Sequence, residues 1–208
     1  IMTDKAKNEY QHNDDGTTYI FIESKGKHFP GKHTVIIDTE DWDKVKGYRW
    51  AIVSSSDQAN RYPYAGTNIP HPDGGWTGSD GSRRRRRTTL PLHHLILEKP
   101  EKGLVIDHIE HNGLDNRKNN LRVCTRSQNC QNKKLRADSA SGYKGVHEDK
   151  SKNLKPFRAY TGDPNKVSRT ISLGYYATAE EAARVYDRKA LELYGEYAYT
   201  NFPKEDYQ

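Results

Sequence analysis

The chain has 208 residues, of which 33% are hydrophobic and 30% are charged, and its formal net charge is +6. A mean hydropathy of −1.07, without an uninterrupted apolar stretch of about 18 residues, excludes an integral membrane protein built from helices, so we expect no membrane partner. The sequence opens on no secretory pattern and its two cysteines are too few for a disulfide framework, so we expect a cytoplasmic, intracellular protein.

The first part of the chain predicts strands and loops. Residues 1–33 contain a single short apolar run, residues 19–22, and we interpret them as an N-terminal arm of uncertain order. The β-branched run Val35–Ile37 and the apolar run Trp50–Val53 indicate two strands. Turn-forming residues occupy almost all of positions 70–82, which predicts a loop.

Five consecutive arginines follow at positions 83–87, at the start of a strongly basic stretch. Residues 83–136 carry 14 basic and 5 acidic side chains, whereas residues 139–208 carry 11 and 10. Such a stretch indicates contact with a polyanion, and a solvated charged surface is the alternative. The arginine run itself is compatible with a basic tail, a solvated turn or a strand along a phosphate backbone. We favour the strand, because the run lies between a loop and the apolar segment 90–97.

Residues 105–132 hold the side chains most suited to chemistry. An apolar pair leads to Asp107 and His108, and a turn rich in Asn, Asp and Gly separates them from a second strand and a short helix. Thr125, with Gln128 three residues later, has the capping-box pattern of a helix start. The segment therefore predicts a strand, a turn, a strand and a helix in this order.

This order brings Asn129 of the short helix close to Asp107 and His108. Carboxylate and amide oxygens suit Mg²⁺ or Mn²⁺. An imidazole beside them has an ordinary pKa close to neutral pH, so it can take a proton from water. Taken alone, an Asp-His dipeptide is more typical of a structural turn than of a site, and the prediction depends on the complete string.

The string DHIEHNGLDNRKNNLRVCTRSQNCQN, residues 107–132, resembles the motif of the HNH nucleases, which have the ββα-metal fold. It has the Asn-terminated form found in phage and intron homing endonucleases. The segments IDTEDWDKVKGYRW, RYPYAG and LHHLIL resemble the β-rich lead-in of the same proteins, so the resemblance covers about residues 34–134.

The resemblance implies hydrolysis of DNA phosphodiester bonds, with 5′-phosphate and 3′-hydroxyl ends. His108 would be the general base, oriented by Asn120, and Arg126 would meet a phosphate. Asp107 and Asn129 would hold one Mg²⁺ or Mn²⁺ ion per active site. Some members of the family carry a structural zinc bound by paired cysteines, but the chain has only two cysteines, so we expect no zinc.

Further DNA contacts are expected on the nuclease side. One departure from the family lies among them, because His93-His94 stands where a His-Arg pair is common, so one phosphate contact is weakened or replaced. The expected contacts are Arg83, Arg85, Arg87, His94 and Arg117.

Three short strand-like runs and one helix make up residues 142–204. The helix is predicted over Ala179–Tyr194, with Thr178 as its N-cap and Gly195 after its end. The stretches LGYYATAEEAARVYDRKALELYG and NFP resemble the ethylene-response-factor (apetala-two) type of DNA-binding domain. That family places its three-stranded sheet in the major groove.

The resemblance implies a set of DNA contacts in this domain. Phe157 and Ser172 stand where the family has tryptophans, so the target sequence is not inherited. A charged sheet without a ligand is the alternative. The implied contacts are Lys144, His147, Lys155, Arg158, Tyr160, Arg169 and Ser172.

These observations predict an α+β protein, with a β-rich N-terminal lead-in, a ββα-metal HNH nuclease core and a three-stranded antiparallel sheet packed on one helix. We expect a site-specific DNA endonuclease of the homing type, acting on double-stranded DNA as a monomer or homodimer in a bacterial or phage-infected cell. A type II restriction endonuclease and a DNA-binding regulator with an inactive nuclease are the alternatives. The predicted segments are an arm at 1–33, the nuclease at 34–134, a linker at 135–141 and the DNA-reading domain at 142–204.

Overall fold

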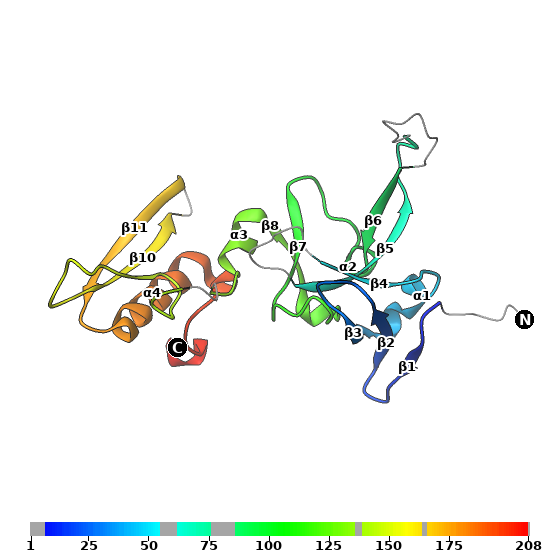
Figure 1. Ribbon diagram of the computed structural model, residues 1–208, viewed down its shortest axis with the longest axis horizontal. Helices are drawn as coiled ribbons and strands as arrows, with labels where there is room; N and C mark the ends of the chain where they lie inside the picture. The colour runs from blue at the N-terminus through cyan, green and yellow to red at the C-terminus, as the bar shows by residue number, and fades with distance from the viewer. Residues whose placement is uncertain (1–6, 55–61, 76–85, 136–138, 164–165, 208) are drawn as a thin grey trace, which may run out of the picture. The chain divides into compact units, whose positions relative to one another are not determined.

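The computed structural model divides the chain into two compact units, Ile1–Val123 and Cys124–Gln208. It describes residues 7–54, 62–75, 86–135, 139–163 and 166–207. Small antiparallel sheets and a few helices make up both units (Figure 1), which confirms the predicted α+β class. The predicted segment boundaries stay predictions. Within the described ranges, no helix is long and apolar enough to cross a membrane.

The first sheet has the strand order β1-β2-β3. Its strands are β1 at Tyr10–His12, β2 at Thr17–Ser24 and β3 at Gly31–Asp38. In β2 the side chains of Ile20 and Ile22 are buried, whereas Phe21 between them is exposed. Residues 10–24, expected to belong to an arm of uncertain order, are therefore part of a sheet. The physical reason is this alternation, which buries one face of β2 against the core.

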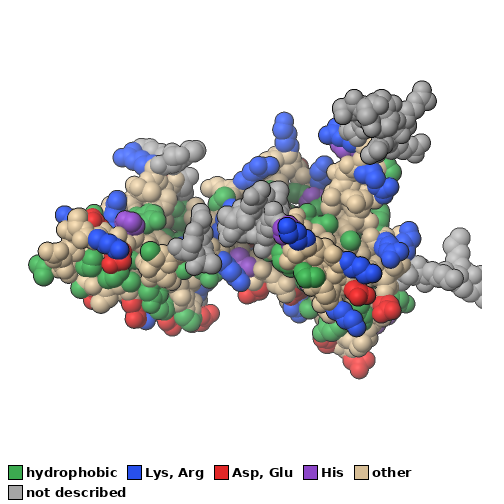
Figure 2. All heavy atoms as spheres, viewed as in Figure 1, with side chains coloured by type: hydrophobic (Ala, Val, Ile, Leu, Met, Phe, Trp, Pro, Cys, Tyr) green, Lys and Arg blue, Asp and Glu red, His purple; other side chains and the backbone are tan. Residues whose placement is uncertain are grey.

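The second sheet has the strand order β4-β5-β6. Its strands are β4 at Ala51–Ser54, β5 at Pro63–Pro70 and β6 at Arg87–Pro91. Of the arginine run predicted to form a strand, Arg87 is the first residue of β6 and Arg86 lies before it, while residues 83–85 lie outside the described part of the chain. Figure 2 shows Lys and Arg side chains beside the β5–β6 hairpin.

Short helical segments connect these sheets to the strand pair that follows. They are η1 at Thr39–Asp41, α1 at Trp42–Val45 and α2 at His93–Ile96. Strand β7, Leu104–His108, then pairs with β8, Leu121–Thr125, and η2 at Lys118–Asn120 lies in the turn between them. The predicted strand–turn–strand order is confirmed.

One hydrophobic core holds the first unit together. It contains Val35 and Ile37 of β3, Trp50 before β4 and Leu92 before α2, all of which are buried. Ile106 of β7 and Leu121 of β8 belong to the same core. The strand pair that carries the nuclease-like residues is therefore anchored by its apolar side chains to both sheets.

The second unit begins with α3, Arg126–Gln131, and continues into a separate sheet and helix. The sheet has the order β11-β10-β9, and α4 at Ala179–Tyr194 packs on it, as Figure 1 shows. The strands are β9 at Val146–Glu148, β10 at Phe157–Asp163 and β11 at Lys166–Tyr176; η3 at Gly195–Tyr197 and η4 at Lys204–Tyr207 follow α4. This confirms the three-stranded sheet with one helix that the sequence predicts.

Helix α4 has the start and the buried face that its sequence predicts. The Thr178 hydroxyl accepts a hydrogen bond from the Glu181 N–H, and the Glu181 carboxylate accepts one from the Thr178 N–H. Ala183, Tyr186 and Ala190 are buried, and Ala159 and Thr161 of β10 are buried on the sheet. Arg158 and Tyr160, which alternate with these residues in β10, are half-buried.

Candidate active site

Asp107 and His108 are the last two residues of β7, and both are 7% exposed. Their strand ends in three consecutive buried residues, of which Ile106 is the first. The apolar core thus holds the end of β7 in place, and the polar pair lies next to it. Burial of two ionisable groups is costly unless they have partners, so their contacts decide their state.

The His108 ring has a polar neighbour from the turn and an aromatic neighbour from α2. Its Nε2 lies 3.3 Å from Oδ1 of the fully buried Asn116. The ring centroids of His108 and His93 are 5.1 Å apart, in an edge-to-face arrangement. Burial lowers the pKa of His108, against the opposing effects of Asn116, Asp107 and Asp115. The imidazole is therefore neutral at pH 7 and able to accept a proton.

An arginine compensates the charge of Asp107. The Arg122 guanidinium donates through Nε and through a terminal nitrogen to Asp107 Oδ2, at 3.1 and 2.9 Å. The two side chains are 11% and 7% exposed, so this is a nearly buried ion pair. Arg122 was not among the expected site residues, and it follows Asn120 and Leu121 directly in the β8 part of the motif.

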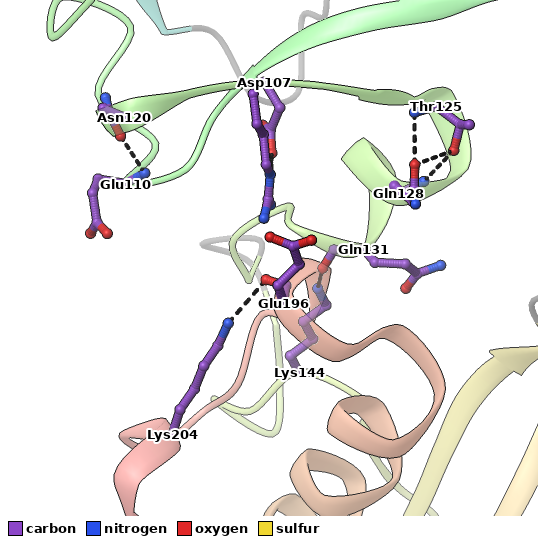
Figure 3. A network of polar contacts seen from close by, with 10 residues as sticks. Asp107, Glu110, Asn120, Thr125, Gln128, Gln131, Lys144, Glu196 and Lys204 are labelled. Atoms are coloured by element: carbon purple, nitrogen blue, oxygen red, sulfur yellow. Dashed lines mark hydrogen bonds and ion pairs between the residues drawn. The ribbon is translucent and has the colours of Figure 1, made fainter. Parts of the chain in front are cut away.

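Asn120, expected to orient the histidine, makes its hydrogen bonds inside the turn. Its Oδ1 accepts from the Glu110 N–H at 2.8 Å, as Figure 3 shows, and its Nδ2 donates to the Asp115 carbonyl at 2.8 Å. Asn120 thereby closes the turn across its base. The side chain that lies against His108 Nε2 is Asn116, which sequence reasoning did not select.

The turn is also attached to the first sheet. The Ile36 N–H donates to the Leu114 carbonyl at 2.8 Å, and the Asn116 N–H donates to the Ile36 carbonyl at 2.7 Å. Asp38 Oδ2 accepts from the Lys118 N–H at 2.8 Å. These bonds to β3 fix the backbone of Asn116, so the β-rich lead-in positions the partner of His108.

His93 is a second buried histidine at this place. Burial and the neighbouring His108 and His94 lower its pKa to about 3, so it is neutral. Its Nδ1 is buried without a hydrogen-bond partner among the described residues. His94, an expected DNA contact, is half-buried, and its pKa is lowered by burial and by Lys99.

The other expected DNA contacts of the first unit differ in the hydrogen bonds that they already make within the protein. Arg117 is paired with Asp115 through two hydrogen bonds of 2.9 and 2.6 Å. Arg87 is exposed and donates to the Asn68 carbonyl at 2.6 Å. Arg83 and Arg85 lie outside the described residues. Arg87 is therefore the better placed of the two described arginines for a phosphate.

Helix α3 carries the last two expected nuclease residues. The Gln128 N–H donates to Thr125 Oγ1 and the Thr125 N–H donates to Gln128 Oε1, so the predicted capping box is present (Figure 3). Arg126 is exposed and Asn129 is half-buried. Asn129 belongs to the second unit, and its expected approach to Asp107 and His108 stays a prediction.

The expected DNA contacts of the sheet fall mostly on its outer face. His147 and Arg158 are paired across β9 and β10, and Tyr160 is paired with Ser172 across β10 and β11. Arg158 Nε donates to Ser172 Oγ at 3.3 Å. Residues directly opposite in neighbouring strands point to the same face, away from the buried Ala159.

The remaining three contacts are placed differently. Lys155 is exposed in the loop before β10, and Arg169 is exposed in β11. The Lys144 ammonium donates instead to the carbonyls of Gln131 and Lys133, at 2.6 and 2.9 Å. Sequence reasoning could not detect this contact, because it joins α3 to a residue across the linker.

Residues 92–131 match the family model described as HNH endonuclease. This stretch of the chain is thus similar to HNH endonucleases. An uncharacterized HNH endonuclease of Acanthamoeba polyphaga mimivirus is 34% identical to this chain over 111 residues, 53% of this chain and 54% of that protein. The chain thus aligns with about half the length of this relative.

Two plant proteins are similar to a smaller part of the chain. The dehydration-responsive element-binding protein 2E of Arabidopsis thaliana is 45% identical over 47 residues, 23% of this chain and 19% of that protein. The protein of the same name in Oryza sativa subsp. japonica is 41% identical over 66 residues, 32% of this chain and 20% of that protein. Both are consistent with a C-terminal domain of the ethylene-response-factor type. No solved structure matches the chain.

The donor set of the HNH segment fits a hard divalent cation. Asp107 offers a carboxylate and Asn129 an amide oxygen, and Mg²⁺ is commonly held by one or two such groups together with water and substrate phosphate. Across the described ranges, no group of three or more His, Cys, Asp and Glu side chains is arranged for a metal ion. Two protein oxygens would leave the remaining coordination positions of such an ion to water and substrate.

Proposed function

We propose that the protein is a divalent-metal-dependent DNA endonuclease whose HNH segment hydrolyses phosphodiester bonds. The observation that carries this proposal is the buried, neutral His108 held against Asn116 beside Asp107, within the segment that matches the HNH endonuclease model. A neutral imidazole next to a carboxylate is the arrangement that general-base activation of water needs.

The contact with Asn116 selects the basic nitrogen of His108. Because Asn116 Oδ1 is a hydrogen-bond acceptor, Nε2 of the neutral ring would carry the hydrogen in this contact, and the other ring nitrogen would be the basic one. Asp107 stabilises the imidazolium that forms, since its charge raises the pKa of His108. Arg126, exposed at the start of α3, is suited to binding a phosphate.

Asp107 and Asn129 would hold the metal ion, Mg²⁺ or Mn²⁺, which when bound stabilises the negative charge of the leaving oxygen. Attack by water then leaves a 5′-phosphate and a 3′-hydroxyl. The outer face of the β9–β11 sheet would read the target sequence through Arg158 and its neighbours. The combination of a cutting and a reading module supports a site-specific enzyme of the homing type.

The histidine gives the decisive test. His108→Ala should reduce Mg²⁺-dependent cleavage by about 100-fold or more, because the general base is lost. Its affinity for uncut DNA, measured without metal, should stay within a few-fold of wild type. His12→Ala, on the exposed strand β1, is the matched control and should leave both quantities unchanged. Cleavage by His108→Ala at the wild-type rate would exclude His108 as the base.

Sequencing the cleavage products of a random DNA library with Mg²⁺ tests the finer proposals together. A long, asymmetric site with 5′-phosphate ends is expected of the homing type. A short palindromic site would favour a restriction enzyme, and binding without cleavage would favour a regulator.

A further inference from the structure

Lys144 connects the reading domain to helix α3. Its ammonium donates to the carbonyl of Gln131, the last residue of α3 (Figure 3). It also donates to the carbonyl of Lys133. The Tyr199 N–H adds a third hydrogen bond, to the Gln131 carbonyl at 3.3 Å. All of these residues belong to the second unit.

Such a contact is needed most by a short helix. Helix α3 has 6 residues, and isolated helices of this length are unstable in water. The carbonyls at the end of a helix lack partners within the helix, and a cation there satisfies them and matches the helix dipole. The capping box stabilises the start of α3, and Lys144 stabilises its end.

The backbone of Lys144 is itself held rigidly. Its N–H donates to Asn201 Oδ1 at 2.7 Å, and its carbonyl accepts from Asn201 Nδ2 at 3.0 Å. Asn201 in turn donates to the carboxylate of Asp187, which is 0% exposed in the middle of α4. A chain of hydrogen bonds therefore runs from the core of the reading domain to the end of α3.

The same environment makes Lys144 a poor phosphate ligand. Two of its three donors serve carbonyls, and its Nζ lies 5.2 Å from the centroid of the Tyr199 ring. Burial lowers the pKa of Lys144 to about 8, against the opposing charges of Asp187 and Cys130. Lys155 and Arg169 are exposed and have none of these constraints.

We propose that Lys144 is a positioning residue that fastens α3, and with it Asn129, to the reading domain, and that it does not bind DNA. The inference rests on the proposed function in one respect, the role of Asn129 as a metal ligand. The fastening itself follows from the contacts of Lys144 alone. It would make the reading domain part of the support of the metal site.

Lys144→Met tests this, because methionine keeps the aliphatic stem and removes the ammonium. Amide hydrogen exchange of α3 should accelerate by about tenfold, the effect expected from losing a charged hydrogen bond. Mn²⁺ affinity should fall several-fold, and DNA affinity without metal should stay unchanged. Lys189→Met is the matched control, because Lys189 Nζ donates to Glu192 Oε1 within α4; it should change none of these quantities.

Lys144→Arg keeps the test valid if the methionine variant unfolds, since arginine retains the charge and the donors. It should preserve slow exchange in α3. The proposal is overturned if the amides of α3 exchange at the wild-type rate in Lys144→Met. It is also overturned if DNA affinity falls in this variant and DNA binding releases about one counterion fewer. If wild type neither binds Mn²⁺ nor cleaves DNA, the proposed function fails, while the exchange measurement still decides the fastening.

Discussion

His108 owes its chemical state to residues from three parts of the chain. The core around β7 buries it, Asn116 from the turn binds its Nε2, and His93 from α2 packs against its ring. Burial lowers the pKa of the imidazole, and the contact with Asn116 opposes this shift. A single Asp-His pair in the sequence therefore becomes a candidate base only through neighbours that the pair does not contain.

At the same scale, Lys144 predicts a pH dependence of stability. Burial lowers its pKa from 10.5 to about 8 in the folded protein. Between these values the unfolded chain binds more protons, so the free energy of unfolding rises with pH. Wild type should therefore gain stability relative to Lys144→Met from pH 8 to pH 10, because the other ionisable groups are common to both.

Urea unfolding of the two proteins across this range measures the difference. A difference that is flat or falls with pH would show that the Lys144 pKa is not lowered in the folded state.

Among the elements, the turn between β7 and β8 depends most on distant parts of the chain. It is bonded to β3 through Ile36 and Asp38, and Gly113 packs so closely on β5 that a Cβ there would lie 2.4 Å from the Pro63 carbonyl oxygen. The β-rich lead-in therefore supports the turn between β7 and β8. Without these strands the turn would lose the bonds that place Asn116.

In the second unit a glycine also lies very close to a neighbouring side chain, so adding one methyl group there should strongly reduce stability. Gly145 has φ +74°, and a Cβ there would lie 2.0 Å from a ring carbon of Tyr186 in α4. Gly145→Ala should destabilise the domain by about 2–4 kcal/mol, the sum of backbone strain and overpacking.

Gly142→Ala is the matched control, because Gly142 has φ +71° but open space around its Cβ position. It should cost only the backbone part, about 1 kcal/mol. Equal losses in urea unfolding of the two variants would mean that Tyr186 moves aside without cost.

For the whole molecule, charge separates the two proposed tasks. Residues 83–136 carry 14 basic and 5 acidic side chains, whereas residues 139–208 carry 11 and 10. The nuclease part should then supply most of the salt-dependent affinity for phosphate, and the nearly neutral sheet should supply discrimination between sequences.

Arg158 tests this division, because it lies on the outer face of the sheet beside Ser172. Arg158→Ala should reduce discrimination between target and random DNA by about tenfold or more, with little effect on random DNA. Binding assays at several salt concentrations measure both. Arg184→Ala, on α4 and paired with Glu180, is the control and should alter neither. If affinity for both DNAs falls in parallel, Arg158 contacts phosphate and does not read bases.

Local patterns alone predicted several parts of the fold. Capping boxes placed the starts of α3 and α4, the β-branched run Val35–Ile37 marked β3, and the 107–132 string gave the resemblance to HNH nucleases. These features can be predicted from sequence because caps, periodicity and motif spacing depend on residues within a few positions of one another.

The contacts between distant segments were decided by the tertiary structure. Asn116 lies against His108 because hydrogen bonds to β3 hold the turn in place. Lys144 reaches the end of α3 because Asn201, itself bonded to α4, holds the Lys144 backbone. Strand β2 forms because the core buries Ile20. Each of these depends on chain segments that meet only after folding. The sequence by itself determined the HNH-like motif, because its residues are close in the chain. The folded core determined which side chains lie against that motif, because they come from distant segments.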